Sequence, residues 1–184
     1  MRFKISEIGD EGLALDVPVT AAWLASECPD LDARPGRGGL RFKGRLQLMD
    51  DQVFLRGDLR GGLETPCARC LEPAAVPLAL PMAVMFVERA PGDDVDGGDE
   101  DDEGEGGDGE PDVARFDGDT IDIGPEVRDQ ILLAMPVSSL CSESCLGLCP
   151  VCGGNRNQSP CDCASRVREV NLSPLAASLA KLKV

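Results

Sequence analysis

Residues 40–59 read LRFKGRLQLMDDQVFLRGDL, and apolar and polar side chains alternate along the first half of this stretch. One side of the alternation carries Leu40, Phe42, Leu46 and Leu48, and the other carries Arg41, Lys43, Arg45 and Gln47. Because successive side chains of a strand point to opposite faces, this pattern predicts a half-buried strand. Asp50-Asp51 supplies a turn, and a partner strand follows with Val53, Leu55 and Leu59 inside and Arg56 and Arg60 outside. The stretch therefore predicts an antiparallel hairpin with one apolar and one basic face.

Shorter signals on both sides of the hairpin extend it into an α+β fold. Strands are predicted at residues 3–6, 75–87 and 120–123, and we expect the second of these to lie at a sheet edge or a bulge because Pro77 and Pro81 interrupt it. Helices are predicted at residues 19–25, after Pro18, and from Gly124-Pro125 up to Pro136, with Val127, Ile131 and Leu132 at helical spacing. A last short helix is expected at residues 173–180. The predicted fold is an antiparallel β-sheet of about five strands with short helices and a C-terminal lobe that binds zinc through four cysteines.

Length and composition exclude several classes of protein. The chain has 184 residues, enough for one ordinary domain or two small ones, and 42% of them are hydrophobic. No apolar run approaches the roughly 18 residues that a membrane span needs, and the N-terminal residues become polar too early for a secretory signal. We therefore expect a cytoplasmic protein with no membrane partner.

The net charge of −15 belongs mainly to one segment. Twelve of the 33 acidic residues and no basic residue lie between Asp93 and Asp112, so the rest of the chain is nearly balanced. A segment of this composition buries too little apolar surface to offset its ordering entropy. We expect a mainly β part at 1–90 that includes a Cys-x-x-Cys motif, a disordered acidic Asp/Gly-rich insertion at 91–112, and a helix, a cysteine-rich zinc-knuckle lobe and a terminal helix at 113–184.

Eight of the nine cysteines are clustered, which favours metal binding in a chain without a predicted signal peptide. The first cluster is a Cys-x-x-Cys motif and the second contains six cysteines; the candidate ligands are Cys67, Cys70, Cys141, Cys145, Cys149, Cys152, Cys161 and Cys163. Two residues between cysteines allow a tight turn to direct both sulfur atoms at one ion, and eight thiolates suffice for two tetrahedral all-cysteine zinc sites. Only Cys28 stands outside the clusters, and we interpret it as a buried apolar residue.

Two arrangements of these ligands remain open. In the first, Cys149, Cys152, Cys161 and Cys163 form a compact local site, while Cys67 and Cys70 join Cys141 and Cys145 across the acidic insertion. In the second, Cys67 and Cys70 pair with Cys149 and Cys152 as in a zinc ribbon. Either way the site of Cys67 and Cys70 is non-local, because two residues cannot satisfy the ion alone.

The order and spacing of these motifs resemble the YceD family of large-ribosomal-RNA accumulation proteins. The resemblance rests on Cys67-x-x-Cys70-Leu71, on Pro136-Val137, on the run from Cys141 through Cys149-Pro150-x-Cys152-Gly153-x-Asn155-x-Asn157 to Cys161-x-Cys163, and on Leu172-Ser173-Pro174-Leu175. It implies a non-enzymatic role in 23S rRNA processing or in assembly of the large ribosomal subunit, in the cytoplasm. The acidic insertion is not part of the family pattern.

A factor that acts on ribosomal RNA needs a surface for phosphates, and the outer face of the hairpin is the candidate. Arg41, Lys43 and Arg45 are spaced to form a stripe, which Arg56 and Arg60 extend across the hairpin. Such a stripe can follow a phosphate backbone, although a solvated sheet face is an equally good interpretation. Because tyrosine is absent and aromatic residues make up only 3%, base stacking is not expected as the main mode of binding. The expected partners are the large-subunit precursor, 23S rRNA or a large-subunit ribosomal protein.

The alternative function is thiol chemistry, either as a thiol-disulfide protein or as a zinc-gated redox switch. Cys67-x-x-Cys70 resembles a redox dithiol, and Arg69 could lower a thiol pKa. The motif nevertheless follows a predicted strand amid glycine and proline, whereas the redox motif begins a helix. The chain has no histidine, and zinc held by four sulfurs has no open position for water, so we expect no enzyme and no small-molecule substrate.

Overall fold

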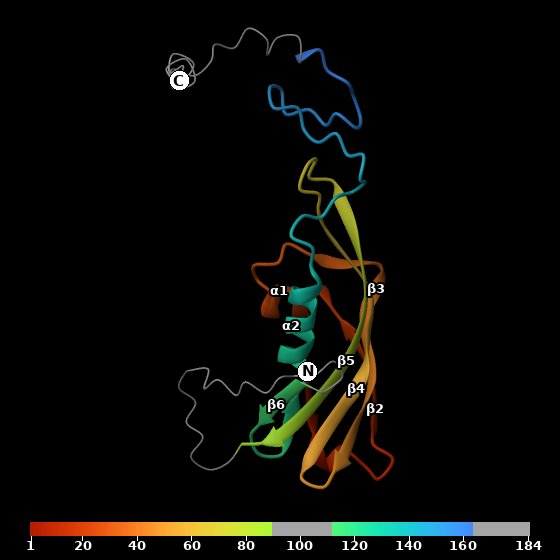
Figure 1. Cartoon of the computed structure of the whole chain (residues 1–184), viewed down its shortest axis with the longest axis vertical. Coiled ribbons are helices and arrows are strands. Elements are labelled where there is room, and N and C mark those ends of the chain that lie inside the picture. Colours follow the sequence, from red (N-terminus) through yellow and green to blue (C-terminus); the bar gives the residue numbers. More distant parts are fainter. Residues whose placement is uncertain (90–111, 164–184) are drawn as a thin grey trace, which may run out of the picture. The chain divides into compact units, whose positions relative to one another are not determined.

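The predicted hairpin lies at the centre of a five-stranded sheet in the computed structural model (Figure 1). The strand order is β2-β3-β4-β5-β6, and the strands are β2 (Leu13–Val19), β3 (Arg34–Met49), β4 (Gln52–Pro66), β5 (Pro73–Glu88) and β6 (Asp112–Phe116). β3 pairs antiparallel with both β2 and β4, and β6 pairs parallel with β5. The α+β class agrees with the sequence-based prediction, and β6 makes the sheet mixed. The strands of this sheet are only partly the predicted ones, because β2 and β6 were not predicted and the strands expected at 3–6 and 120–123 lie outside it.

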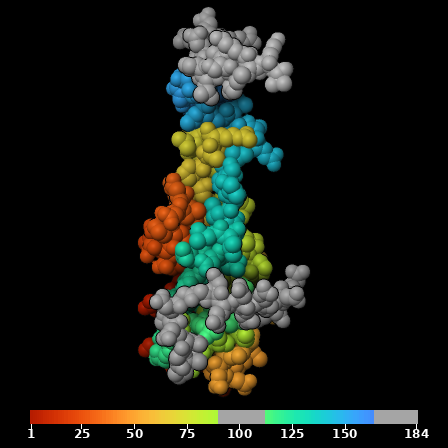
Figure 2. Space-filling model, turned by 60° about the vertical axis from the view of Figure 1, so that its left-hand side comes forward, coloured from red at the N-terminus to blue at the C-terminus, as the bar shows by residue number. Residues whose placement is uncertain are grey.

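A second, two-stranded sheet and two helices complete this part of the fold. β1 (Arg2–Lys4) pairs antiparallel with β7 (Thr120–Asp122), and a 3₁₀ turn (Ile5–Glu7) follows β1. The Thr20 hydroxyl accepts a hydrogen bond from the backbone N–H of Trp23 over 3.2 Å and caps α1 (Ala21–Glu27). α2 (Gly124–Ala134) begins with proline in its first turn, and the Asp122 carboxylate accepts from the N–H of Gly124. α1 and α2 lie side by side (Figures 1 and 2).

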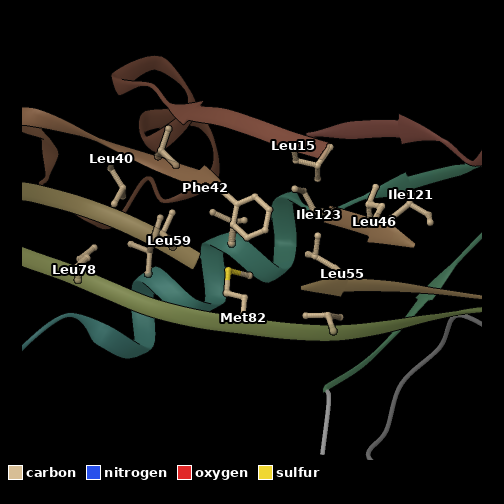
Figure 3. Close-up of a cluster of buried hydrophobic side chains, with 14 of the residues drawn as sticks. Leu15, Leu40, Phe42, Leu46, Leu55, Leu59, Leu78, Met82, Ile121 and Ile123 are labelled. Atoms are coloured by element: carbon tan, nitrogen blue, oxygen red, sulfur yellow. The ribbon is translucent and has the colours of Figure 1, made fainter. Parts of the chain in front are cut away.

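The apolar face of the sheet packs against both helices to form one core (Figure 3). Leu24 of α1 and Val127 and Ile131 of α2 are fully buried in it. The sheet contributes the apolar side chains of the predicted alternation together with residues of β2 and β5; labelled in Figure 3 are Leu15, Leu40, Phe42, Leu46, Leu55, Leu59, Leu78 and Met82. Because this face is buried, the opposite face of β3 and β4 presents its charged side chains to solvent.

The structure refines four of the sequence-based expectations. β5 lies between β4 and β6, but Pro77 and Pro81 precede Val84, where pairing with β6 begins, so both prolines stand in the part of β5 that does not pair with β6. The strand expected at residues 3–6 ends at Lys4. Leu48, expected inside, is 47% exposed near the end of the hairpin, and Leu132 of α2 is 39% exposed.

The structure describes residues 1–89 and 112–163, which divide into two units. Among the described residues, the first unit comprises those of Met1–Thr65 and Ala75–Val137, and the second comprises Pro66–Ala74 and the residues from Ser138 to Cys163. This division departs from the expected one at 113–184, because β6, β7 and α2 pair and pack within the first unit. The acidic segment lies outside the described residues except for Asp112, which begins β6, and the helix expected at 173–180 lies outside them entirely. No helix within the described ranges is long and apolar enough to cross a membrane.

Candidate metal centres

The eight clustered cysteines lie in the second unit, where they form two groups of four. The first group contains Cys67, Cys70, Cys141 and Cys145, and the second contains Cys149, Cys152, Cys161 and Cys163. Within each group, all sulfur atoms lie within 4.8 Å of one another. The structure therefore contains the first of the two arrangements considered above. It does not pair Cys67 and Cys70 with Cys149 and Cys152 as in a zinc ribbon. Cys28 is buried in the core of the first unit.

The sulfur–sulfur distances of the first group fit a tetrahedral ion. Cys67 Sγ lies 3.8 Å from Cys145 Sγ, and Cys70 Sγ lies 3.5 Å from Cys141 Sγ. A tetrahedron with metal–sulfur bonds of about 2.3 Å has sulfur–sulfur edges of about 3.8 Å. Four thiolates at this spacing match the donor set and geometry of structural zinc sites, and they leave no ligand position for water or substrate.

The two Cys-x-x-Cys turns have the same backbone hydrogen bonds. In the first, Cys67 N–H donates to the carbonyl of Glu72 over 2.8 Å, and Leu71 N–H donates to the carbonyl of Cys67 over 3.0 Å. In the second, the N–H of Cys149 donates to Gly154 over 2.8 Å and the N–H of Gly153 donates to Cys149 over 2.9 Å. Each group thus consists of one such turn, a knuckle, and two further cysteines. The Cys67 knuckle follows the end of β4 and is not the start of a helix, so it lacks the structural context of a redox dithiol.

Backbone N–H groups and neighbouring thiols shift the thiol pKa values in opposite directions. Hydrogen bonds from backbone N–H groups, first that of Cys141, lower the pKa of Cys67 to about 6, and those of Cys152 and Val151 do the same for Cys149. Neighbouring thiols, first that of Cys70, raise the pKa of Cys141 to about 12, and the Cys152 thiol and burial raise that of Cys163 to about 12. Each group thus contains thiols with a lowered pKa beside thiols with a raised pKa.

The two groups differ in exposure. In the first group three cysteines are buried and only Cys141 is exposed, and a small apolar cluster with Ala74, Leu140 and Leu148 surrounds the buried ones. In the second group Cys149 is buried, Cys152 is exposed, and Cys161 and Cys163 are half-buried. The second group is therefore the more accessible to chelators and oxidants among the residues that the structure describes.

Polar side chains contact the first group, and of these only Arg69 was assigned a role in the sequence analysis, that of lowering a thiol pKa. Asn157 Nδ2 donates to Cys145 Sγ over 3.3 Å, and Arg69 Nη1 donates to the Cys145 carbonyl over 3.0 Å. Gln158 Nε2 donates to the Glu72 carboxylate over 2.8 Å. The only signal in the sequence was the Asn-x-Asn at 155–157, directly beside a knuckle.

The predicted basic stripe lies on the outer face of β3 and β4 and contains two acids that the stripe prediction did not include. Arg41 lies directly opposite Arg60, and Arg45 lies opposite Arg56, as expected for a stripe that crosses the hairpin. Between these pairs, Lys43 lies between Asp58 of β4 and Asp16 of β2. The register of β2, which places Asp16 on this face, could not be derived from residues 40–59 alone.

Ion pairs partly neutralise this face. Asp16 accepts from Arg41 over 2.8 Å and lies 3.7 Å from the Lys43 ammonium, and Asp58 lies 3.3 Å from the Arg60 guanidinium. Arg45 donates to the backbone carbonyl of Glu11. A shallow hollow of about 410 Å³ is lined by Arg41, Lys43, Asp58 and Arg60. Five cations and two acids give the face a net positive charge.

Comparisons with known proteins agree with the resemblance seen in the motifs. The family model described as large ribosomal RNA subunit accumulation protein YceD matches residues 55–183. A Zea mays protein named large ribosomal RNA subunit accumulation protein YCED homolog 1, chloroplastic, is 31% identical over 152 residues, which cover 73% of this chain and 49% of the relative. The Arabidopsis thaliana protein of the same name is 34% identical over 55 residues, 30% of this chain and 17% of the relative.

A bacterial relative extends the comparison. The uncharacterized Bacillus subtilis protein YlbN is 32% identical over 112 residues, which cover 60% of this chain and 57% of the relative. The chain spans about half or less of the length of the plastid relatives. No solved structure matches it. Because the family model covers more than half of the residues, the chain belongs to the YceD family.

Proposed function

We propose that this YceD-family chain is a non-enzymatic, zinc-binding factor that supports the processing and accumulation of 23S rRNA and the assembly of the large ribosomal subunit. The observation that carries the proposal is the family match over residues 55–183, which includes β4 from Leu55 onwards and both cysteine groups. Both plant relatives are named large ribosomal RNA subunit accumulation proteins. A cytoplasmic location is part of the same proposal.

Zinc is the proposed cofactor, with one ion in each cysteine group. Sulfur-only coordination supports a structural role, because four thiolates saturate the ion and leave no position for an activated water. The ion of the first group would join Pro66–Ala74 to the distant segment beginning at Ser138, which the small apolar cluster around Cys145 holds together only in part, and the ion of the second group would close a local loop within residues 149–163. Structural zinc supplies folding free energy directly, so the second unit is expected to need it.

The outer face of β3 and β4 is the proposed contact for RNA, through Arg41, Lys43, Arg45, Arg56 and Arg60. Arg41 and Arg60 lie directly opposite each other, and like charges in that position repel. A phosphate bound between them would relieve this repulsion and could also compete with Asp16 and Asp58 for the cations. This favours 23S rRNA over a ribosomal protein as the direct partner.

Crosslinking of the tagged chain in cells, followed by sequencing of the attached RNA and identification of the attached proteins, tests the proposal. We expect 23S rRNA precursor fragments, with crosslinked peptides from β3 or β4. Recovery of a large-subunit ribosomal protein without RNA would transfer the contact to a protein partner. Absence of both would contradict the proposed function.

A zinc-gated redox switch is the second candidate, and the exposure of Cys152 together with the half-buried Cys161 and Cys163 favours it. Oxidation of the second group by a peroxide would form disulfides and release its ion. Counting zinc and free thiols before and after mild peroxide treatment discriminates between the two. Retention of zinc and of all thiols would eliminate the switch.

A further inference from the structure

Residues 155–158 lie in the segment that connects two ligands of the second group, Cys152 and Cys161. Local hydrogen bonds fix this segment: Asn155 forms an antiparallel bridge with Leu148, and its carbonyl accepts from the N–H groups of Gln158 and Ser159 over 3.1 Å each. The Asn155 side-chain carbonyl also accepts from the backbone N–H of Asn157 over 3.0 Å. An ion in the second group would hold both ends of the segment and so restrict its conformation.

The same segment contacts the first group at its ligands. Asn157 Nδ2 donates to Cys145 Sγ over 3.3 Å, while Asn157 Oδ1 accepts from the N–H of Leu146 over 2.8 Å. These two bonds hold the side-chain amide of Asn157 against both Cys145 and Leu146. The side chain of Asn157 thus connects the loop of one cysteine group directly to a ligand atom of the other.

A second connection reaches the other half of the first group. Glu72 Oε1 accepts from Gln158 Nε2 over 2.8 Å and from Asn155 Nδ2 over 3.4 Å. The backbone carbonyl of Glu72 accepts from the N–H of Cys67, so the same residue closes the Cys67–Cys70 knuckle. The 155–158 segment therefore contacts both the knuckle and the Cys145 side of the first group.

We propose that the two cysteine groups bind their ions cooperatively, with Asn157 as the positioning residue that couples them. This inference rests on the proposed zinc binding. An N–H donor to a metal-bound thiolate offsets part of its negative charge and fixes its direction, as partners of ligands do in other metal sites. An ion in the second group would hold the Asn157 side-chain amide in place before an ion enters the first group. Coupling between two binding sites is reciprocal, so filling the first group strengthens the second by the same factor.

The coupling factor can be measured on the full chain with zinc alone in competition with a chromophoric chelator. Cys149→Ser with Cys152→Ser leaves only the first group, and Cys67→Ser with Cys70→Ser leaves only the second. We expect the overall two-ion constant of the unaltered chain to exceed the product of the two single-group constants by about tenfold, within the range typical of coupled sites. Equality between them would overturn the proposal.

A second measurement keeps all eight ligands. Asn157→Asp retains an acceptor for Leu146 but replaces the nitrogen that donates to Cys145 Sγ and to the Asn155 side-chain carbonyl with an oxygen. Arg156→Ala alters the neighbouring, exposed side chain and makes the net charge more negative by the same one unit, as a matched control. Native mass spectrometry during chelation should show both ions leaving together in the unaltered chain and in the control, with a one-ion species accumulating only in Asn157→Asp. Equal accumulation in all three proteins would contradict the coupling. A chain that binds no zinc would instead contradict the proposed cofactor.

Discussion

Leu71 and Gly153 occupy equivalent positions, each directly after the second cysteine of a knuckle. Both have left-handed backbones, with φ of 64° at Leu71 and 71° at Gly153. Each N–H donates to the carbonyl of the first cysteine of its own knuckle. Glycine adopts this conformation without cost, whereas a side chain there is strained by about 1 to 2 kcal/mol. Leu71 is also 67% exposed, so burial of its side chain offers little compensation.

Leu71→Gly is therefore expected to stabilise the first knuckle by up to about 1 kcal/mol, since relief of strain exceeds the greater entropy of glycine in the unfolded chain. Gly153→Ala should destabilise the second knuckle by about 1 kcal/mol, because it introduces the same strain although nothing lies within 4 Å of the added methyl group. Hydrogen exchange of the knuckle amides in the zinc-loaded protein measures both. Leu71→Ala is the control; stabilisation by it as large as by glycine would show that the backbone conformation is not the cause.

The sequence was most informative where one local pattern determines the structure. The alternation from Leu40 to Leu46 predicts β3 correctly because a sheet with one buried face fixes every second side chain. The alternation failed at Leu48, where the strand runs beyond the core. The parallel pairing of β5 with β6 was not predicted, because it is a long-range contact that the positions of Pro77 and Pro81 do not determine.

The cysteine spacing indicated the candidate ligands but left their arrangement open, since Cys67 and Cys141 are separated by more than seventy residues of sequence. Only the folded chain brings the two segments together. The same holds for Asn157 and for Asp16, whose partners lie on other segments. Contacts of this kind depend on register and on loop conformation, which no local pattern determines.

Removal of the ions should unfold the second unit alone. The first unit has its own core of fully buried side chains from the sheet and both helices, whereas the described part of the second unit has only a small cluster around three cysteines. After strong chelation, we expect the amides of Cys67, Leu148 and Cys149 to lose their hydrogen-exchange protection while those of β3 and β4 keep theirs. Protection that survives at the knuckles without metal would contradict a structural role for zinc.

Zinc binding should release close to four protons per ion at pH 7.5. The metal-free second unit is expected to be unfolded, so its thiols have the ordinary pKa of 9.0 and are mostly protonated before the ion binds, whereas in the folded knuckles the pKa values of Cys67 and Cys149 are lowered to about 6. Because the folded pKa lies below the unfolded one, the contribution of these two thiols to stability is complete above pH 9 and is lost as the pH falls towards 6. Calorimetry in buffers of different ionisation enthalpy counts the protons. Release of markedly fewer than four per ion would show that the knuckles are folded, with ionised thiols, before the ion binds.

Gly44→Ala should destabilise the first unit by at least about 1 to 3 kcal/mol, the usual cost of overpacking a core. Gly44 pairs with Gly57 across β3 and β4, and an added methyl group would lie 2.7 Å from Cζ of the fully buried Phe42 and 2.6 Å from the Arg56 carbonyl. Neither neighbour can move freely. Denaturant unfolding followed by Trp23 fluorescence measures the loss. Gly38→Ala, where nothing lies within 4 Å, is the control and should be nearly neutral.

Asp16 is expected to weaken RNA binding, because its carboxylate occupies Arg41 and Lys43. Asp16→Asn should therefore increase the affinity for a 23S rRNA fragment and steepen its salt dependence, while Arg41→Glu with Arg45→Glu should reduce both. Arg128→Glu, on α2 and so outside the hairpin, is the control for a change of net charge. Affinities measured across a series of salt concentrations separate the outcomes. If Asp16→Asn and Arg128→Glu shift the affinity only in proportion to net charge, the outer face of β3 and β4 makes no specific contact with RNA.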